Sequence, residues 1–158
     1  MKHRHETTPP KLAVFSDIDG TLIDHDTYSY AAARDCLAIL RRKKIPLVLA
    51  SSKTSAEIIP LRQELGFAGA PAICENGAGL IDGGAWVRAP DGDYAGLRRL
   101  LQGVPTELRR HFRGFGDMTT KEVVEATGLS AEAAERARQR EFSEPGLWSG
   151  DDDEKSAF

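Results

Sequence analysis

Two aspartates one residue apart carry the clearest chemical signal in the sequence. Asp17 and Asp19 follow the apolar run 12–15 and precede Gly20 and Thr21. Side chains at positions i and i+2 leave a strand on the same side, so the two carboxylates can converge on one ligand. Hard oxygen ligands at this spacing suit Mg²⁺. An ordinary turn after a strand is the simpler explanation of a bare Asp-x-Asp pair.

A metal-screened carboxylate pair has the chemistry for phosphoryl transfer. An aspartate can attack phosphorus without first losing a proton, provided that a cation screens the approach of one anion to another. The second carboxylate could protonate the leaving alkoxide and later take a proton from water. Gly20 lacks Cβ, which lets the backbone approach a ligand or adopt a positive φ, and Thr21 adds a hydroxyl group.

The elements around the pair indicate an α/β fold. The apolar run before Asp17 predicts a strand covered on both faces, as in a parallel sheet whose strand ends carry ligands. Two further strands are expected at 45–50 and 71–74, and two helices at 30–43 and 55–65. Ser29 is the expected N-cap of the first helix and Gly66 ends the second. Alternating strands and helices predict parallel crossover units, a Rossmann-like core.

Polar residues at the ends of the second and third strands are candidates for substrate contacts. Ser51 and Ser52 offer hydroxyl groups directly before a helix N-terminus, a good place for a phosphate oxygen, although helix capping explains them too. Lys53 could bind a negative charge of the substrate, although the sequence fits an ordinary surface lysine nearly as well. Asn76 follows the third strand, where Asn76-Gly77 also fits a tight turn.

The later chain predicts a hairpin and several helices. The hairpin spans 79–88 with its turn at 82–84, and Ser149 is expected to cap a last helix. Near 138–145, arginines precede a proline, so Arg140 could bind carboxylate or phosphate, and a salt-bridged helix end explains it equally well. Helices are expected at 94–111, at 121–126 after Thr119 or Thr120, and at 131–140 after Ser130.

Composition excludes several function classes. The chain has 158 residues, 41% hydrophobic and 28% charged, with a net charge of −3, which gives no electrostatic case for nucleic acid or anionic membrane. No apolar segment approaches the roughly 18 residues of a membrane span, and cytoplasmic residence is expected. Residues 1–10 form a polar leader that we expect to be disordered. Cys36 and Cys74 are expected to be buried small side chains without chemistry.

Six sequence segments together resemble one enzyme family. The string Phe-Ser-Asp-Ile-Asp-Gly-Thr-Leu-Ile-Asp resembles the first motif of the haloacid dehalogenase superfamily, most of whose members are phosphatases. Ser51 matches the superfamily's second motif. The other five segments are Ser-Ser-Lys-Thr, Glu-Asn-Gly-Ala, Gly-Phe-Gly-Asp-Met, Thr-Gly-Leu-Ser and Arg-Glu-Phe-Ser-Glu-Pro. Together the six make the chain, from about 12 to 148, similar to the mannosyl-3-phosphoglycerate phosphatase family.

The resemblance implies Mg²⁺-dependent hydrolysis of mannosyl-3-phosphoglycerate to mannosylglycerate and phosphate. It implies Asp17 as nucleophile and metal ligand, and Asp19 as general acid and base whose backbone carbonyl also reaches the metal. Arg140 and Glu144 would lie close to the organic part of the substrate. Another phosphorylated sugar as substrate is the nearest alternative. A non-catalytic chain that binds ligand or a partner chain is the alternative of another class.

The same resemblance divides the chain into parts. Residues 11–82 would form the N-terminal part of a phosphatase core, and 83–158 an inserted α+β cap. A lysine motif and an acidic motif that the superfamily places after the cap have no counterpart here. We therefore expect the C-terminal part of the core to be missing, an exposed sheet edge, and pairing with a missing C-terminal segment.

Overall fold

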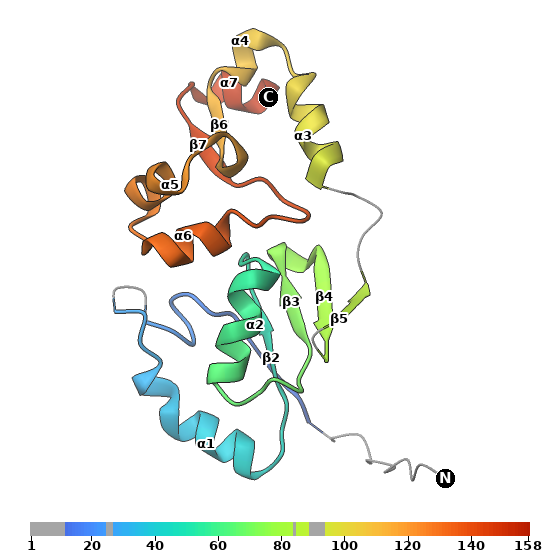
Figure 1. The fold of residues 1–158 in the computed structure, drawn as a ribbon, viewed down its shortest axis with the longest axis vertical. Coiled ribbons are helices and arrows are strands. Elements are labelled where there is room, and N and C mark those ends of the chain that lie inside the picture. Colours follow the sequence, from blue (N-terminus) through green and yellow to red (C-terminus); the bar gives the residue numbers. More distant parts are fainter. Residues whose placement is uncertain (1–11, 25–26, 84, 89–93) are drawn as a thin grey trace.

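The computed structural model describes residues 12–24, 27–83, 85–88 and 94–158, whose elements form two units (Figure 1). The N-terminal unit, residues 12–88, contains a five-stranded sheet in the order β1-β2-β3-β4-β5. β1, β2 and β3 are parallel, while β4 and β5 add an antiparallel hairpin. The strands are β1 (Val14–Ser16), β2 (Leu47–Ala50), β3 (Ala72–Cys74), β4 (Gly79–Asp82) and β5 (Ala85–Arg88).

Two crossover helices connect the parallel strands. α1 (Arg34–Arg42) follows a short 3₁₀ turn, Ala31–Ala33, and α2 (Ser55–Glu64) follows β2. Thr54 begins α2 with a capping box, because its Oγ1 accepts the N–H of Glu57 at 3.3 Å and the Glu57 carboxylate accepts the N–H of Thr54. The expected α/β fold with a parallel sheet is confirmed.

The sheet is covered by helices on one face. Both crossovers step in the same direction, from β1 to β2 and from β2 to β3, and right-handed crossovers of that kind place both helices on the same side. Leu37 and Ile58 pack there in the core with Leu49. β1 is an edge strand, and its Phe15 side chain is 65% exposed. The prediction that this strand is covered on both faces is therefore wrong for the described residues. The predicted exposed sheet edge is present.

The C-terminal unit, residues 94–158, is mostly helical with one small sheet. β6 (Phe112–Gly114) and β7 (Gly146–Trp148) pair antiparallel. Between them, α5 and α6 pack through Met118, Val123 and Ala134. The helices are α3 (Tyr94–Gln102), α4 (Thr106–Arg109), α5 (Thr120–Thr127), α6 (Ala131–Ala137) and α7 (Asp152–Ala157).

Three helix boundaries differ from the expected ones. The helix expected at 94–111 is broken before α4, because Pro105 has no backbone N–H and its ψ of 135° is extended. The last helix is capped by Asp151, whose side chain accepts the N–H of Glu154 at 2.8 Å, and not by Ser149. Ser29 Oγ accepts the N–H of Ala31 at 3.1 Å, but α1 itself begins only at Arg34.

Two N-cap predictions and the hairpin are confirmed, whereas the helix expected at 131–140 ends at Ala137. Thr119 caps α5 within a capping box with Glu122, and Ser130 caps α6 by accepting the N–H of Ala133 at 3.2 Å. The hairpin of β4 and β5 forms where it was expected. The expected leader, 1–10, lies outside the described residues. None of the helices that the structure describes has the length and apolar character needed to cross a membrane.

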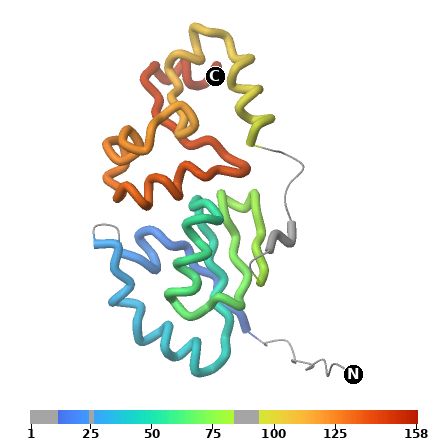
Figure 2. Tube along the Cα trace, in the orientation of Figure 1, coloured from blue at the N-terminus to red at the C-terminus, as the bar shows by residue number. Residues whose placement is uncertain are grey.

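The C-terminal unit lies over one end of the parallel sheet. Figure 2 shows the orange segment that contains α6 next to the tips of the green strands. Thr54 Oγ1 donates to the carbonyl oxygen of Arg136 at 3.0 Å, and Ser55 Oγ donates to the Glu141 carboxylate at 2.7 Å. These bonds join the start of α2 to the end of α6, at the edge where β1, β2 and β3 finish.

Candidate active site

A small pocket lies at the carboxyl ends of the three parallel strands. Its volume is about 390 Å³, and its polar lining residues are Asp17, Ser51, Ser52 and Asn76. Asp17 follows β1, the serines follow β2, and Asn76 follows β3. The parallel topology therefore brings together four of the residues that the sequence singled out, although they come from three separate segments.

The serine loop is held in place by backbone hydrogen bonds. Ser51 is 7% exposed, and its N–H donates to the carbonyl oxygen of Ile73 at 3.0 Å. Ser51 Oγ accepts the N–H of Lys53 at 3.3 Å, while the N–H of Asn76 donates to the Ser51 carbonyl oxygen at 3.0 Å. The hydroxyl group of Ser51 thus sits on a fixed backbone at the pocket wall.

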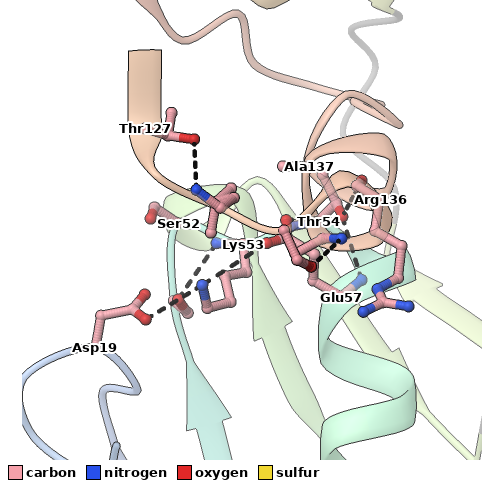
Figure 3. A network of polar contacts seen from close by, with 12 residues as sticks. Asp19, Ser52, Lys53, Thr54, Glu57, Thr127, Arg136 and Ala137 are labelled. Atoms are coloured by element: carbon pink, nitrogen blue, oxygen red, sulfur yellow. Dashed lines mark hydrogen bonds and ion pairs between the residues drawn. The ribbon is translucent and has the colours of Figure 1, made fainter. Parts of the chain in front are cut away.

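Lys53 connects the serine loop to the second aspartate. Its Nζ lies 3.2 Å from Asp19 Oδ1 and 3.7 Å from Glu57 Oε1 (Figure 3). The side chains of Lys53 and Asp19 are 18% and 37% exposed, so water partly screens this pair. The ion pair holds Asp19 near the end of β2, next to the pocket that Asp17 lines.

Gly20 and Thr21 lie along a neighbouring cavity. That cavity has a volume of about 400 Å³ and is bounded on its other side by Ala32 and Ala33 before α1. Gly20 has a φ of +72°, which agrees with the expected positive φ, and its N–H donates to the Ile23 carbonyl oxygen at 2.8 Å. The structure therefore does not bring Gly20 and Thr21 into the pocket of Asp17.

The donor set fits a magnesium ion that completes its shell with water and phosphate. Among the described residues, no group of three or more His, Cys, Asp or Glu side chains could hold a metal ion by itself. Mg²⁺ is commonly bound by one or two carboxylates plus waters and substrate oxygens. Asp17 supplies one carboxylate and is exposed to incoming ligand, and the backbone carbonyl oxygen of Asp19 is the expected second ligand.

Arg140 reaches the serine loop from the C-terminal unit. One of its guanidinium nitrogens, Nη1, donates to the carbonyl oxygen of Ser52 at 2.7 Å, and Nε donates to the Ala137 carbonyl oxygen at 2.9 Å. The guanidinium carbon lies 5.9 Å from the centre of the Phe115 ring. The structure thus brings Arg140 beside the pocket residue Ser52.

Glu144 is held by contacts inside the C-terminal unit. Its side chain is 2% exposed, and its carboxylate accepts hydrogen bonds from Tyr94 Oη, from Arg98 Nη1 at 2.8 Å and from the N–H of Gly116 at 2.8 Å. The Tyr94 pKa is raised, first by burial and then by the hydrogen bond to the Glu144 carboxylate. The structure does not bring Glu144 into the pocket of Asp17.

Asp117 extends this charged cluster. Arg98 donates to one of its carboxylate oxygens, and Arg109 Nη2 to the other at 2.7 Å. Burial opposes ionisation of Asp117, but the bonds from Arg98, Arg109 and the N–H of Gly114 outweigh it and lower the pKa to about 2. The cluster joins α3 and α4 to the 3₁₀ turn Phe115–Asp117, which follows β6.

Sequence reasoning missed the contribution of Glu75. Glu75 is 2% exposed, and its carboxylate accepts hydrogen bonds from residues 141–143 of the C-terminal unit. The available signal was its position, since it is the first charged residue after the apolar strand 72–74. Cys74 is buried as expected, and this burial raises the pKa of its thiol to about 12, with Glu75 as the next cause. Cys36, however, is exposed and not buried.

A larger cavity lies elsewhere. Its volume is about 910 Å³, and Ala13, Pro46 and Pro71 place it at the amino ends of the parallel strands. Its lining is mainly apolar and includes the exposed Phe15. Ligands of open parallel sheets bind at the carboxyl ends of the strands. The smaller pocket of Asp17 is therefore the better candidate active site.

The sequence has clear relatives among phosphatases. Residues 14–87 match the family of haloacid dehalogenase-like hydrolases. A glucosyl-3-phosphoglycerate/mannosyl-3-phosphoglycerate phosphatase of Persephonella marina is 34% identical over 148 residues, covering 85% of this chain and 54% of that protein. A protein of the same name from Methanococcoides burtonii is 36% identical over 149 residues, with the same two coverages. The chain spans about half the length of these curated relatives.

The fold has a solved counterpart. A phosphatase of the haloalkanoate enzyme superfamily from Bacteroides thetaiotaomicron superposes with a TM-score of 0.54 at 14% identity, covering 81% of this chain and 52% of that one. At that identity the likeness shows the fold alone. In sequence, the chain is similar to haloacid dehalogenase-like hydrolases and to two curated phosphatases, as its motifs predicted, and its fold agrees with that similarity.

Proposed function

We propose that the chain supplies the catalytic pocket of a phosphomonoester hydrolase that acts on mannosyl-3-phosphoglycerate or its glucosyl counterpart. The observation that carries this proposal is the gathering of Asp17, Ser51, Ser52 and Asn76 in one pocket at the carboxyl ends of neighbouring parallel strands. The names of the curated relatives support the substrate class.

The reaction would proceed in two steps. A carboxylate oxygen of Asp17 attacks the phosphorus, and the bond from phosphorus to the substrate oxygen breaks as the new bond forms. Asp19 gives its proton to the leaving alkoxide and then takes one from the water that attacks the aspartyl phosphate. Phosphate leaves, and both aspartates return to their starting states.

The remaining pocket residues would position the phosphate. Ser51 and Ser52 can donate hydroxyl hydrogens to its oxygens near the N-terminus of α2, where the helix dipole favours an anion. Lys53, paired with Asp19, places a positive charge next to the reaction. Asn76 is a further proposed contact with the substrate or its phosphate. Mg²⁺ bound by Asp17 and Asp19 would screen the negative charges of carboxylate and phosphate.

The C-terminal unit is proposed to act as the cap. The division that the sequence suggests, 11–82 for the core and 83–158 for the cap, stays a proposal, and β5 after that boundary still pairs with β4. Arg140 is the proposed cap residue for the organic part of the substrate, since its guanidinium lies at the Ser52 carbonyl and can bind a carboxylate in bidentate fashion.

Turnover of a panel of substrates tests the proposal. Phosphate release would be measured from mannosyl-3-phosphoglycerate, its glucosyl counterpart and other sugar phosphates, with Mg²⁺ and with a chelator. We expect Mg²⁺-dependent release from the first two and none from Asp17→Asn, with Asp82→Asn as the matched control. Equal activity of Asp17→Asn would refute the nucleophile assignment.

A second candidate is a chain that binds ligand but needs a second polypeptide for turnover. The exposed Phe15 on the edge strand β1 favours it, because an unpaired strand edge with apolar side chains is a surface for another chain. Binding of 3-phosphoglycerate by calorimetry, without phosphate release from any substrate of the panel, would support this candidate over the first.

A further inference from the structure

Glu75 is a buried carboxylate whose hydrogen-bond donors come from the other unit. The N–H of Glu141 donates to Oε1 at 2.9 Å, and the N–H groups of Phe142 and Ser143 donate to Oε2 at 3.1 and 2.8 Å. Ser143 Oγ adds a fourth bond to Oε2 at 2.6 Å. Successive backbone N–H groups that converge on one anion form a binding site for negative charge.

Among the residues that the structure describes, Glu75 forms no ion pair with a basic side chain. A buried carboxylate is costly unless hydrogen bonds replace its water. All four bonds named above cross from the N-terminal to the C-terminal unit. The four hydrogen bonds of this buried carboxylate therefore exist only while residues 141–143 stay in place.

The backbone at Glu75 is itself held in an uncommon conformation. Glu75 has a φ of +47° and Asn76 a φ of +59°, both in the left-handed region. Asparagine adopts that region readily, whereas for glutamate it costs conformational free energy. A residue keeps such a conformation when the surrounding structure fixes it. The N–H of Glu75 donates to the Lys53 carbonyl oxygen at 3.0 Å, which ties this turn to the serine loop. The turn sends Glu75 to the C-terminal unit and leaves Asn76 at the pocket.

The segment that Glu75 binds, residues 141–143, directly follows Arg140. Arg140 precedes Glu141 directly and bonds the Ser52 carbonyl, while the Glu141 carboxylate accepts a bond from Ser55. Fixing residues 141–143 therefore also fixes where the guanidinium lies relative to the pocket.

We propose that Glu75 is a positioning residue, whose carboxylate fastens residues 141–143 to the end of β3 and so holds Arg140 beside the substrate pocket. The part that concerns substrate rests on the proposed phosphatase function. The attachment of residues 141–143 to Glu75 concerns only the contact between the two units and does not depend on catalysis.

The fastening is tested by amide hydrogen exchange in the full chain, followed by NMR. Glu75→Gln removes the charge of the carboxylate at nearly constant volume, and Ser143→Ala removes one of its four donors. We expect exchange of the amides of 141–143 to become about tenfold faster in Glu75→Gln, because bonds to a charged group are stronger than neutral ones. The amides of β2 should be unaffected, and Glu125→Gln on the exposed side of α5 serves as the matched control.

The positioning of Arg140 is tested by calorimetry with 3-phosphoglycerate and Mg²⁺. Glu75→Gln and Arg140→Ala are each expected to weaken binding severalfold, and the double variant to be no weaker than Arg140→Ala within twofold. Unchanged exchange at 141–143 in Glu75→Gln, or effects that multiply in the double variant, would overturn the proposal. Faster exchange in a chain that releases no phosphate from any substrate would instead retain the fastening and count against the phosphatase function.

Discussion

Replacing Glu144 by alanine separates a structural role from a role in substrate binding. The resemblance to mannosyl-3-phosphoglycerate phosphatases implies that Glu144 lies near the substrate, whereas its carboxylate is 2% exposed and accepts bonds from Tyr94, Arg98 and Gly116. We therefore predict that Glu144→Ala chiefly destabilises the C-terminal unit.

The expected loss follows from the three hydrogen bonds. Each contributes on the order of 1 kcal/mol net, more where a charge takes part, and Arg98 keeps its second partner Asp117. The sum is about 3 kcal/mol, a large share of the roughly 5–15 kcal/mol typical of a domain. In urea, with a slope of about 2 kcal/mol per molar, the midpoint should fall by about 1.5 M.

The assay is equilibrium unfolding in urea, followed by tryptophan fluorescence. Trp148 lies in β7 and reports on the C-terminal unit. Glu144→Gln keeps the shape and one acceptor oxygen, so it should cost less than alanine. Glu125→Ala, on an exposed side chain of α5, is the matched control and should shift the midpoint little. A loss below about 1 kcal/mol in Glu144→Ala, together with a tenfold higher KM, would refute the structural role.

Two further predictions concern titration and thiol reactivity. Since Arg98 and Arg109 lower the folded-state pKa of Asp117 to about 2 from 3.8, its ionised form stabilises the fold above pH 4, and about 1 kcal/mol should be lost as the pH falls from 4 to 2. Acid unfolding of Asp117→Asn should lack this component, and an identical acid profile would contradict the assignment. At pH 8 a disulfide reagent should modify the exposed Cys36 rapidly and Cys74 only after unfolding, because burial raises the Cys74 pKa to about 12. Two thiols modified at the same rate in the native chain would disprove that burial protects Cys74.

The strands and helices of the five-stranded sheet, and the position of Asp17, could be predicted from the local pattern of apolar and polar residues. Apolar runs that end in polar residues mark the carboxyl ends of buried strands, and the parallel order then brings those ends together. Thr119 and Ser130 were recognisable as caps because the residue type and the following helix formers agree.

Contacts between the two units could not be predicted from the sequence. In the sequence, Glu75 looks like an ordinary turn residue. Its left-handed backbone and its four hydrogen-bond donors are seen only in the folded chain, where residues 141–143 lie against it. The boundaries of short helices failed for a related reason. Asp151 and Ser149 are both good N-caps, and the choice was made by tertiary structure, because the N–H of Ser149 donates to the His111 carbonyl oxygen.

The most direct test of the central claim is whether phosphate becomes bonded to Asp17. The chain would be mixed with Mg²⁺ and labelled 3-phosphoglyceryl substrate, quenched in acid, and digested for mass spectrometry. We predict a transient phosphate on the peptide that contains Asp17, removed by hydroxylamine as an acyl phosphate is, and absent from Asp17→Asn. Substrate turnover without any label on this peptide, or label that persists in Asp17→Asn, would contradict the account.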